Sequence, residues 1–147
     1  MHVDYSIVAR VGISLTVFLS TYGAVRLFTS MQRRRLRGQE IDAPPGSAPV
    51  SDSPRLLYFW TEECVQCRVQ EREIERALER LDRSGRLLTV NKLNAHQEKA
   101  LTEKLRVMTV PTTVLLSSAG SVVGWNPGLT KASRIVEESS KAVSALD

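Results

Sequence analysis

Residues 56–67 read LLYFWTEECVQC, and the architecture of the chain follows from this segment. Its first five residues are apolar or aromatic, and such a short run is typical of a buried β-strand. Thr61, a residue type that often starts a helix, comes next, and Cys64 and Cys67 follow one helical turn apart. The segment therefore predicts a strand that leads directly into a helix with two cysteines in its first turn.

The chain contains only these two cysteines. Three positions apart, they are too close to join distant parts of the chain as a structural disulfide does. Their spacing indicates redox chemistry or metal ligation. The alternative is that both cysteines are only small buried residues of the core. At a helix start, the dipole and free backbone amides favour the thiolate of Cys64, while Cys67 lies one turn deeper on nearly the same face.

Hydrophobic periodicity and turn residues outline six further elements. In chain order these are a helix at 64–82, a strand at 86–93, a helix at 95–105, strands at 112–116 and 121–125, and a helix at 130–145. This order requires a crossover, and hence parallel pairing, between the first two strands, and a hairpin between the last two. The expected fold class is α/β, with a four-stranded mixed sheet flanked by helices.

The strand, the Cys-x-x-Cys at a helix start and the later Val110-Pro111-Thr112 before a strand resemble the thioredoxin fold family over about residues 55–145. The resemblance implies a minimal thioredoxin-like fold and a protein-disulfide reductase. Cys64 would attack a substrate disulfide, and Cys67 would resolve the mixed disulfide. A cis Val110–Pro111 bond would lie beside the sulfurs, with both residues binding the substrate chain.

The resemblance also implies a role for Trp60 as a wall beside the site, for which core packing is the alternative. Protein disulfides are the implied substrates, and a thioredoxin-reductase-type protein is the implied electron donor. We expect no cofactor beyond the redox-active cysteine pair, and no metal.

Four features depart from the family pattern. Glu63 stands where thioredoxins have Trp, and Val65-Gln66 replaces Gly-Pro between the cysteines. Tyr58 occupies the place of a buried Asp, although Lys92 is retained. No counterpart of the family's leading strand and helix is found before residue 55.

The N-terminal segment is apolar, small or hydroxylic throughout residues 11–25, between Arg10 and Arg26. It predicts a single transmembrane helix as a membrane anchor in residues 1–30, contacting lipid. A cleaved signal peptide or an interfacial helix are the alternatives. One arginine precedes the segment and five follow it, so the following domain is expected in the cytoplasm, with an exported position as the alternative.

Composition divides the rest of the chain into two parts. Residues 31–54 are a basic flank followed by a linker rich in Pro, Gly and Ser, and residues 55–147 form the expected domain. From residue 51 onward, fourteen Lys and Arg face thirteen acidic residues. This part lacks the basic excess that nucleic-acid binding requires, so no nucleic-acid partner is expected.

A non-catalytic module that binds a partner or a metal is the competing function. His96 follows the second expected strand, so it could lie near the same sheet edge as the cysteines. Two cysteines and His96 would still leave zinc one ligand short of four.

Overall fold

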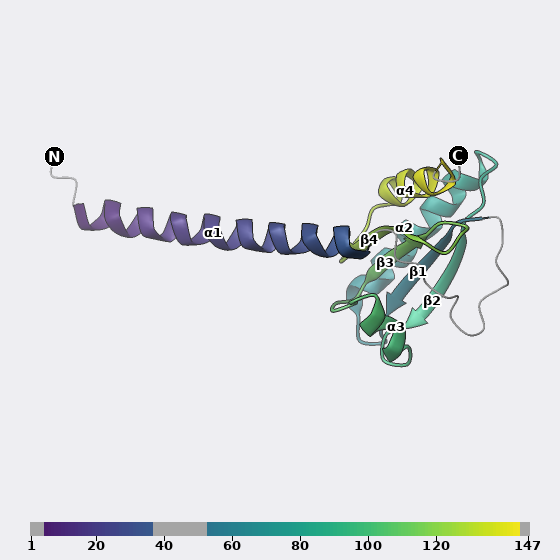
Figure 1. The fold of residues 1–147 in the computed structure, drawn as a ribbon, viewed down its shortest axis with the longest axis horizontal. Coiled ribbons are helices and arrows are strands. Elements are labelled where there is room, and N and C mark those ends of the chain that lie inside the picture. Colours follow the sequence, from purple (N-terminus) through teal and green to yellow (C-terminus); the bar gives the residue numbers. More distant parts are fainter. Residues whose placement is uncertain (1–4, 37–52, 145–147) are drawn as a thin grey trace. The chain divides into compact units, whose positions relative to one another are not determined.

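The computed structural model describes residues 5–36 and 53–144 (Figure 1). The chain divides into two compact units, Met1–Arg35 and Leu36–Asp147. Most of the predicted linker at 31–54 lies outside the described residues.

The second unit contains a four-stranded sheet in the order β2-β1-β3-β4. The strands are β1 (Arg55–Trp60), β2 (Thr89–Asn94), β3 (Thr112–Leu116) and β4 (Val122–Pro127). β1 pairs with β2 in parallel and with β3 in antiparallel orientation, and β3 and β4 form an antiparallel hairpin. The predicted mixed sheet, its parallel crossover and its hairpin are therefore confirmed.

Alternate side chains of β1 enter two separate cores. Leu57 and Phe59 pack on one face of the sheet with Leu105 and Trp125. Leu56 and Tyr58 pack on the other face, which also contains Cys67. Because side chains of a strand alternate between faces, a strand buried on both sides needs the continuous apolar run that this one has.

Two long helices of the domain pack against each other, α2 (Val65–Asp82) and α4 (Ala132–Ser144) (Figure 1). Both contribute apolar side chains to the core that contains Cys67. The short helix α3 (Lys99–Lys104) follows β2. All seven elements predicted after residue 55 are present, and their ends differ by a few residues because local patterns locate helix and strand ends poorly.

Polar side chains of α2 fix the chain around the start of α4. The Gln70 side chain is fully buried and forms two hydrogen bonds with the backbone of Thr130, donating to its carbonyl at 3.1 Å and accepting from its amide at 2.7 Å. One turn further, the Glu73 carboxylate accepts from the amide of Ala132 at 2.8 Å. This hydrogen bond is the main cause that lowers the pKa of Glu73 below its ordinary value.

All but the last residue of the helix α1 (Tyr5–Leu36) belongs to the first unit, and the helix exposes apolar side chains such as Ile13, Val17 and Phe18. Among the described residues, however, no helix is both long enough and apolar enough to cross a membrane. The predicted transmembrane helix is therefore not confirmed. Hydroxyl side chains interrupt the apolar stretch between Arg10 and Arg26, at Ser14, Thr16, Ser20 and Thr21.

Replacing Gln70 by Leu should destabilise the domain, because Leu keeps the approximate size but leaves the buried Thr130 amide and carbonyl without these partners. We expect the free energy of unfolding to fall by about 2 kcal/mol, within the usual cost of leaving buried polar groups unsatisfied. Urea denaturation followed by circular dichroism measures the change. The exposed Gln97→Leu is the matched control, and equal stability of the two variants would contradict the assigned role.

Candidate functional site

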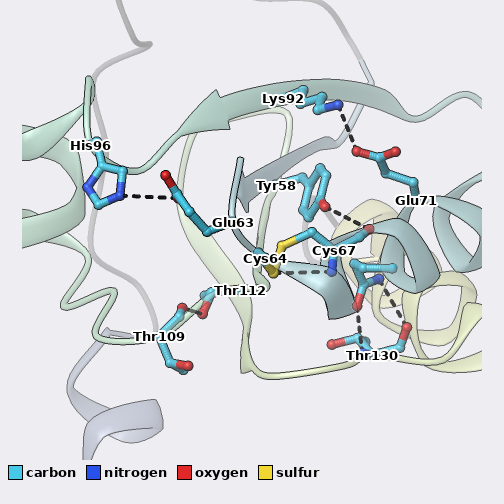
Figure 2. The surroundings of a disulfide bond; sticks show 11 residues. Tyr58, Glu63, Cys64, Cys67, Glu71, Lys92, His96, Thr109, Thr112 and Thr130 are labelled. Atoms are coloured by element: carbon cyan, nitrogen blue, oxygen red, sulfur yellow. Dashed lines mark hydrogen bonds and ion pairs between the residues drawn. A yellow bond between two sulfur atoms is a disulfide. The ribbon is translucent and has the colours of Figure 1, made fainter. Parts of the chain in front are cut away.

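The two cysteines lie at the start of α2 and form a disulfide (Figure 2). Cys64 is the N-cap residue, with extended backbone angles, and its Sγ accepts a hydrogen bond from the Cys67 amide at 3.1 Å. The first amides of a helix have no partner within the helix, so a cap acceptor stabilises the start. Here a sulfur atom takes that place.

Cys64 and Cys67 differ in accessibility. Cys64 is half-buried and lines an open hollow of about 320 Å³. Cys67 is only 3% exposed and belongs to the core between the sheet and the helices. An external disulfide can therefore approach Cys64 but not Cys67. We call this space the Cys64 hollow, and its lining residues are Thr61, Glu63, Cys64, Val65, Gln66 and Val110.

The segment before β3 brings Val110, one of the predicted binding residues, to the Cys64 hollow. The Val110–Pro111 peptide bond is cis, as the resemblance implied, and Val110 lines the Cys64 hollow. The carbonyl of Pro111 accepts a hydrogen bond from the amide of Gly128 at 2.8 Å, which ties this segment to the end of β4. Val110 and the cysteines are thus close together in space although more than forty positions separate them.

Trp60, also predicted to bind the substrate, is placed differently from Val110. It is not among the residues that line the Cys64 hollow, and it packs partly buried against the core that contains Cys67. The ammonium of Lys92 lies 4.2 Å from the centre of its ring, a cation–π contact. Substrate contact by Trp60 stays a prediction, whereas core packing is observed.

Tyr58 lies beneath the cysteine pair, at the position where the resemblance places a buried acid. Its side chain is 1% exposed, and its hydroxyl donates a hydrogen bond to the carbonyl of Cys67 at 3.0 Å (Figure 2). Burial, and secondarily the negative charge of Glu71, raise the pKa of Tyr58 well above its ordinary value. This phenol is therefore neutral and acts as a hydrogen-bond donor to the first turn of α2.

The sequence analysis missed Glu71. Its carboxylate forms an ion pair with Lys92 at 2.7 Å, and both side chains are partly exposed. Lys92 is the register partner of Tyr58 across the β1–β2 pair, so Glu71, Lys92 and Tyr58 lie together (Figure 2). The sequence does indicate that Glu71 lies near the cysteines, since it is four residues after Cys67 and thus on the same side of α2.

His96 lies beside Glu63. Its Nε2 atom is 3.9 Å from the Glu63 carboxylate, and both side chains are more than 70% exposed (Figure 2). Glu63 immediately precedes Cys64, so its negative charge disfavours the thiolate and opposes the helix dipole. Because exposed charges are screened by solvent, we expect the carboxylate to offset only part of the dipole's effect.

Comparisons with known proteins agree with this geometry. Residues 47–140 match the family model of thioredoxin. A thioredoxin of Streptomyces clavuligerus is 37% identical over 62 residues, which is 42% of this chain and 54% of that protein.

Solved structures show the same fold. Thioredoxin-2, a component of the protein secretion machinery of the malaria parasite, aligns with a TM-score of 0.56 and 17% identity over 70% of this chain and 96% of its own. Chloroplastic thioredoxin z aligns with a TM-score of 0.53 and 26% identity over 63% of this chain and 80% of its own.

The second unit therefore has a thioredoxin fold with a cysteine pair at the expected helix start. Since the family model matches more than half of the length of this chain, the chain belongs to the thioredoxin family. The chain spans about half the length of the curated relative that it matches.

Replacing Tyr58 by Phe should remove the hydrogen bond to Cys67 and keep the buried ring. We expect the free energy of unfolding to fall by about 1 kcal/mol near neutral pH, the usual net contribution of one hydrogen bond. The raised pKa means that Tyr58 ionises more readily in the unfolded chain. The contribution of the Tyr58 hydroxyl to the free energy of unfolding is therefore fully present below the ordinary tyrosine pKa of about 10. It is lost as the pH rises above this value.

The stability difference between wild type and Tyr58→Phe should thus shrink as the pH is raised from neutral to above about 10. Urea denaturation at several pH values measures it, with the exposed Tyr22→Phe as control. A difference that stays constant over this range would contradict a neutral, buried phenol.

Proposed function

We propose that this domain is a thiol/disulfide oxidoreductase that reduces protein disulfides through Cys64 and Cys67. The observation that carries the proposal is the unequal placement of the two bonded sulfurs. Cys64 caps α2 and borders the Cys64 hollow, whereas Cys67 is buried directly behind it. We infer that an external disulfide reacts with the Cys64 sulfur, whereas the buried Cys67 sulfur reacts only with Cys64.

The reaction starts from the reduced pair. Free amides and the positive end of the α2 dipole favour the thiolate of Cys64. This thiolate attacks one sulfur of the substrate disulfide, so the substrate S–S bond breaks and a mixed disulfide forms. The released substrate thiolate takes a proton from solvent.

Cys67 then completes the exchange. Its thiol loses a proton and attacks the Cys64 sulfur of the mixed disulfide, which releases the second substrate thiolate. Two electrons pass from the cysteine pair to the substrate, and the Cys64–Cys67 disulfide of the present structure is the product. A thioredoxin-reductase-type donor would return the pair to its reduced form.

The substrate chain is proposed to lie along the segment before β3. Val110 borders the Cys64 hollow, and its cis bond to Pro111 leads from there into β3. The exposed Val65 also lines the hollow and offers apolar contact there. No cofactor is proposed beyond the cysteine pair.

Replacing Cys67 by Ser should trap mixed disulfides through Cys64, because the attack no longer has a resolving thiol. Replacing Cys64 by Ser should trap almost none, since Cys67 is buried. Non-reducing electrophoresis with mass spectrometry after incubation with a disulfide-bonded protein measures the trapped fraction. Equal trapping by both variants would contradict the assigned order.

Turnover is tested by insulin reduction with thioredoxin reductase and NADPH. The proposed function predicts catalysed precipitation of the insulin B chain, and the double variant Cys64→Ser with Cys67→Ser should show none. Absence of turnover by the wild-type chain would favour the competing interpretation, a module that binds a partner or metal without exchange.

Membrane attachment through the N-terminal segment and a cytoplasmic position of the domain stay predictions from the sequence. They are supported by the apolar side chains that α1 exposes, including Leu15, Phe18 and Leu19, and by the five arginines that follow the apolar stretch. A cytoplasmic position would place the cysteine pair in a reducing compartment.

Carbonate washing of membranes tests attachment of the full-length chain. We expect the chain to stay in the membrane pellet, and its release into the wash would contradict attachment. Labelling of intact cells with a membrane-impermeant maleimide then tests the side. A cytoplasmic domain predicts protection of Cys64 until the cells are opened, whereas immediate labelling would place the domain outside.

A further inference from the structure

The Cys64 hollow carries one negative charge beside the reactive sulfur. Among its lining residues, only Glu63 and Cys64 have ionisable side chains, and the others are polar or apolar without charge. Glu63 is directly before Cys64 in the chain, and its side chain is 78% exposed. The family resemblance places an uncharged Trp at this position, so the charge is a feature of this chain.

The carboxylate of Glu63 is open to an external cation. Within residues 53–144 its ion-pair contact is with His96, whose Nε2 lies 3.9 Å away and is cationic only when the imidazole is protonated. The imidazole is itself 72% exposed, and an ion pair this long and this well solvated is weak. By contrast, the carboxylate of Glu71, on the far side of the cysteine pair, is held by Lys92 at 2.7 Å.

A substrate cysteine bonded to Cys64 brings its own neighbours next to Glu63. The residues that flank this cysteine then lie within a few ångströms of the carboxylate, which is inside the Debye length of about 8 Å at physiological salt. A cationic side chain there is attracted, and an anionic one is repelled. We propose that Glu63 is a specificity-determining residue that favours disulfides flanked by Arg or Lys, an inference that rests on the proposed exchange at Cys64.

Glu63 also acts on Cys64 itself, and a test must separate this effect from the preference for cationic substrates. Its charge disfavours the Cys64 thiolate and so slows exchange with every substrate by the same factor. This factor cancels when two substrates react with the same protein. The ratio of the two rate constants therefore contains only the effects of substrate charge, and the part caused by Glu63 is the part that is lost in Glu63→Gln.

The experiment uses two peptides, Ala-Arg-Cys-Arg-Ala and Ala-Glu-Cys-Glu-Ala, each activated at Cys as the thiopyridyl disulfide. Stopped-flow absorbance of the released pyridinethione gives the rate constant for attack by the reduced full-length chain. We expect the arginine peptide to react about fivefold faster than the glutamate peptide at low salt, and less than about twofold faster at 1 M salt, because salt screens exposed charges.

Three variants locate the effect. Glu63→Gln should lower the ratio toward one, chiefly by raising the rate constant of the glutamate peptide, which is no longer repelled. Glu62→Gln should keep most of the preference, because Glu62 is exposed but does not line the hollow. Glu75→Gln, an exposed acid about 15 Å further along α2 by helical rise, should leave the ratio unchanged.

Three outcomes would overturn the inference, and the last is distinguishable from the first two. Fast reaction of both peptides with a ratio near one, or an unchanged ratio in Glu63→Gln, contradicts the role of Glu63 and leaves the proposed function standing. Reaction of both peptides no faster than with free glutathione under the same conditions contradicts the proposed function and the inference together.

Discussion

The start of α2 is capped by a hydrogen bond from the amide of Cys67 to Sγ of Cys64, and the same amide also donates to the Cys64 carbonyl at 3.2 Å. The first amides of a helix lack helical partners, and here a sulfur replaces the usual hydroxyl or carboxylate cap. The same contact places Cys64 at the positive end of the helix dipole and Cys67 one turn inside. Helix initiation and the redox site therefore share the Cys64 side chain, and a change to that residue affects both.

The sheet brings the rest of the site to this helix start. β1 is buried on both faces, so a slip of one residue would exchange its two sets of core side chains, and its register is strongly specified. In that register Phe59, near the end of β1, pairs with Thr112, the first residue of β3. The loop after β1, which leads to Cys64, and the Val110–Pro111 bond thus meet at one edge of the sheet.

The sequence predicts what local patterns determine. The seven elements of the domain and the helix-start cysteines follow from periodicity and spacing, and the cis bond follows from family resemblance. The hydrogen bonds of Gln70 to Thr130 join residues 60 positions apart, so no local pattern indicates them. The hydrogen bond of Tyr58 to Cys67 and the Lys92–Glu71 ion pair likewise join residues on different elements, so they are visible only in the folded structure. In α1 an apolar stretch predicted a membrane span that the described helix does not provide.

The most direct test of a redox site built from these two sulfurs is their equilibrium with glutathione. The full-length chain is equilibrated in buffers of varying ratio of reduced to oxidised glutathione, acid-quenched and analysed by intact mass. We predict one reversible two-electron transition between the dithiol and the Cys64–Cys67 disulfide, with little glutathione adduct, because Cys67 lies directly behind Cys64 and displaces it. A stable adduct on Cys64 beside a free Cys67, or a pair that stays reduced at every ratio, would contradict the account.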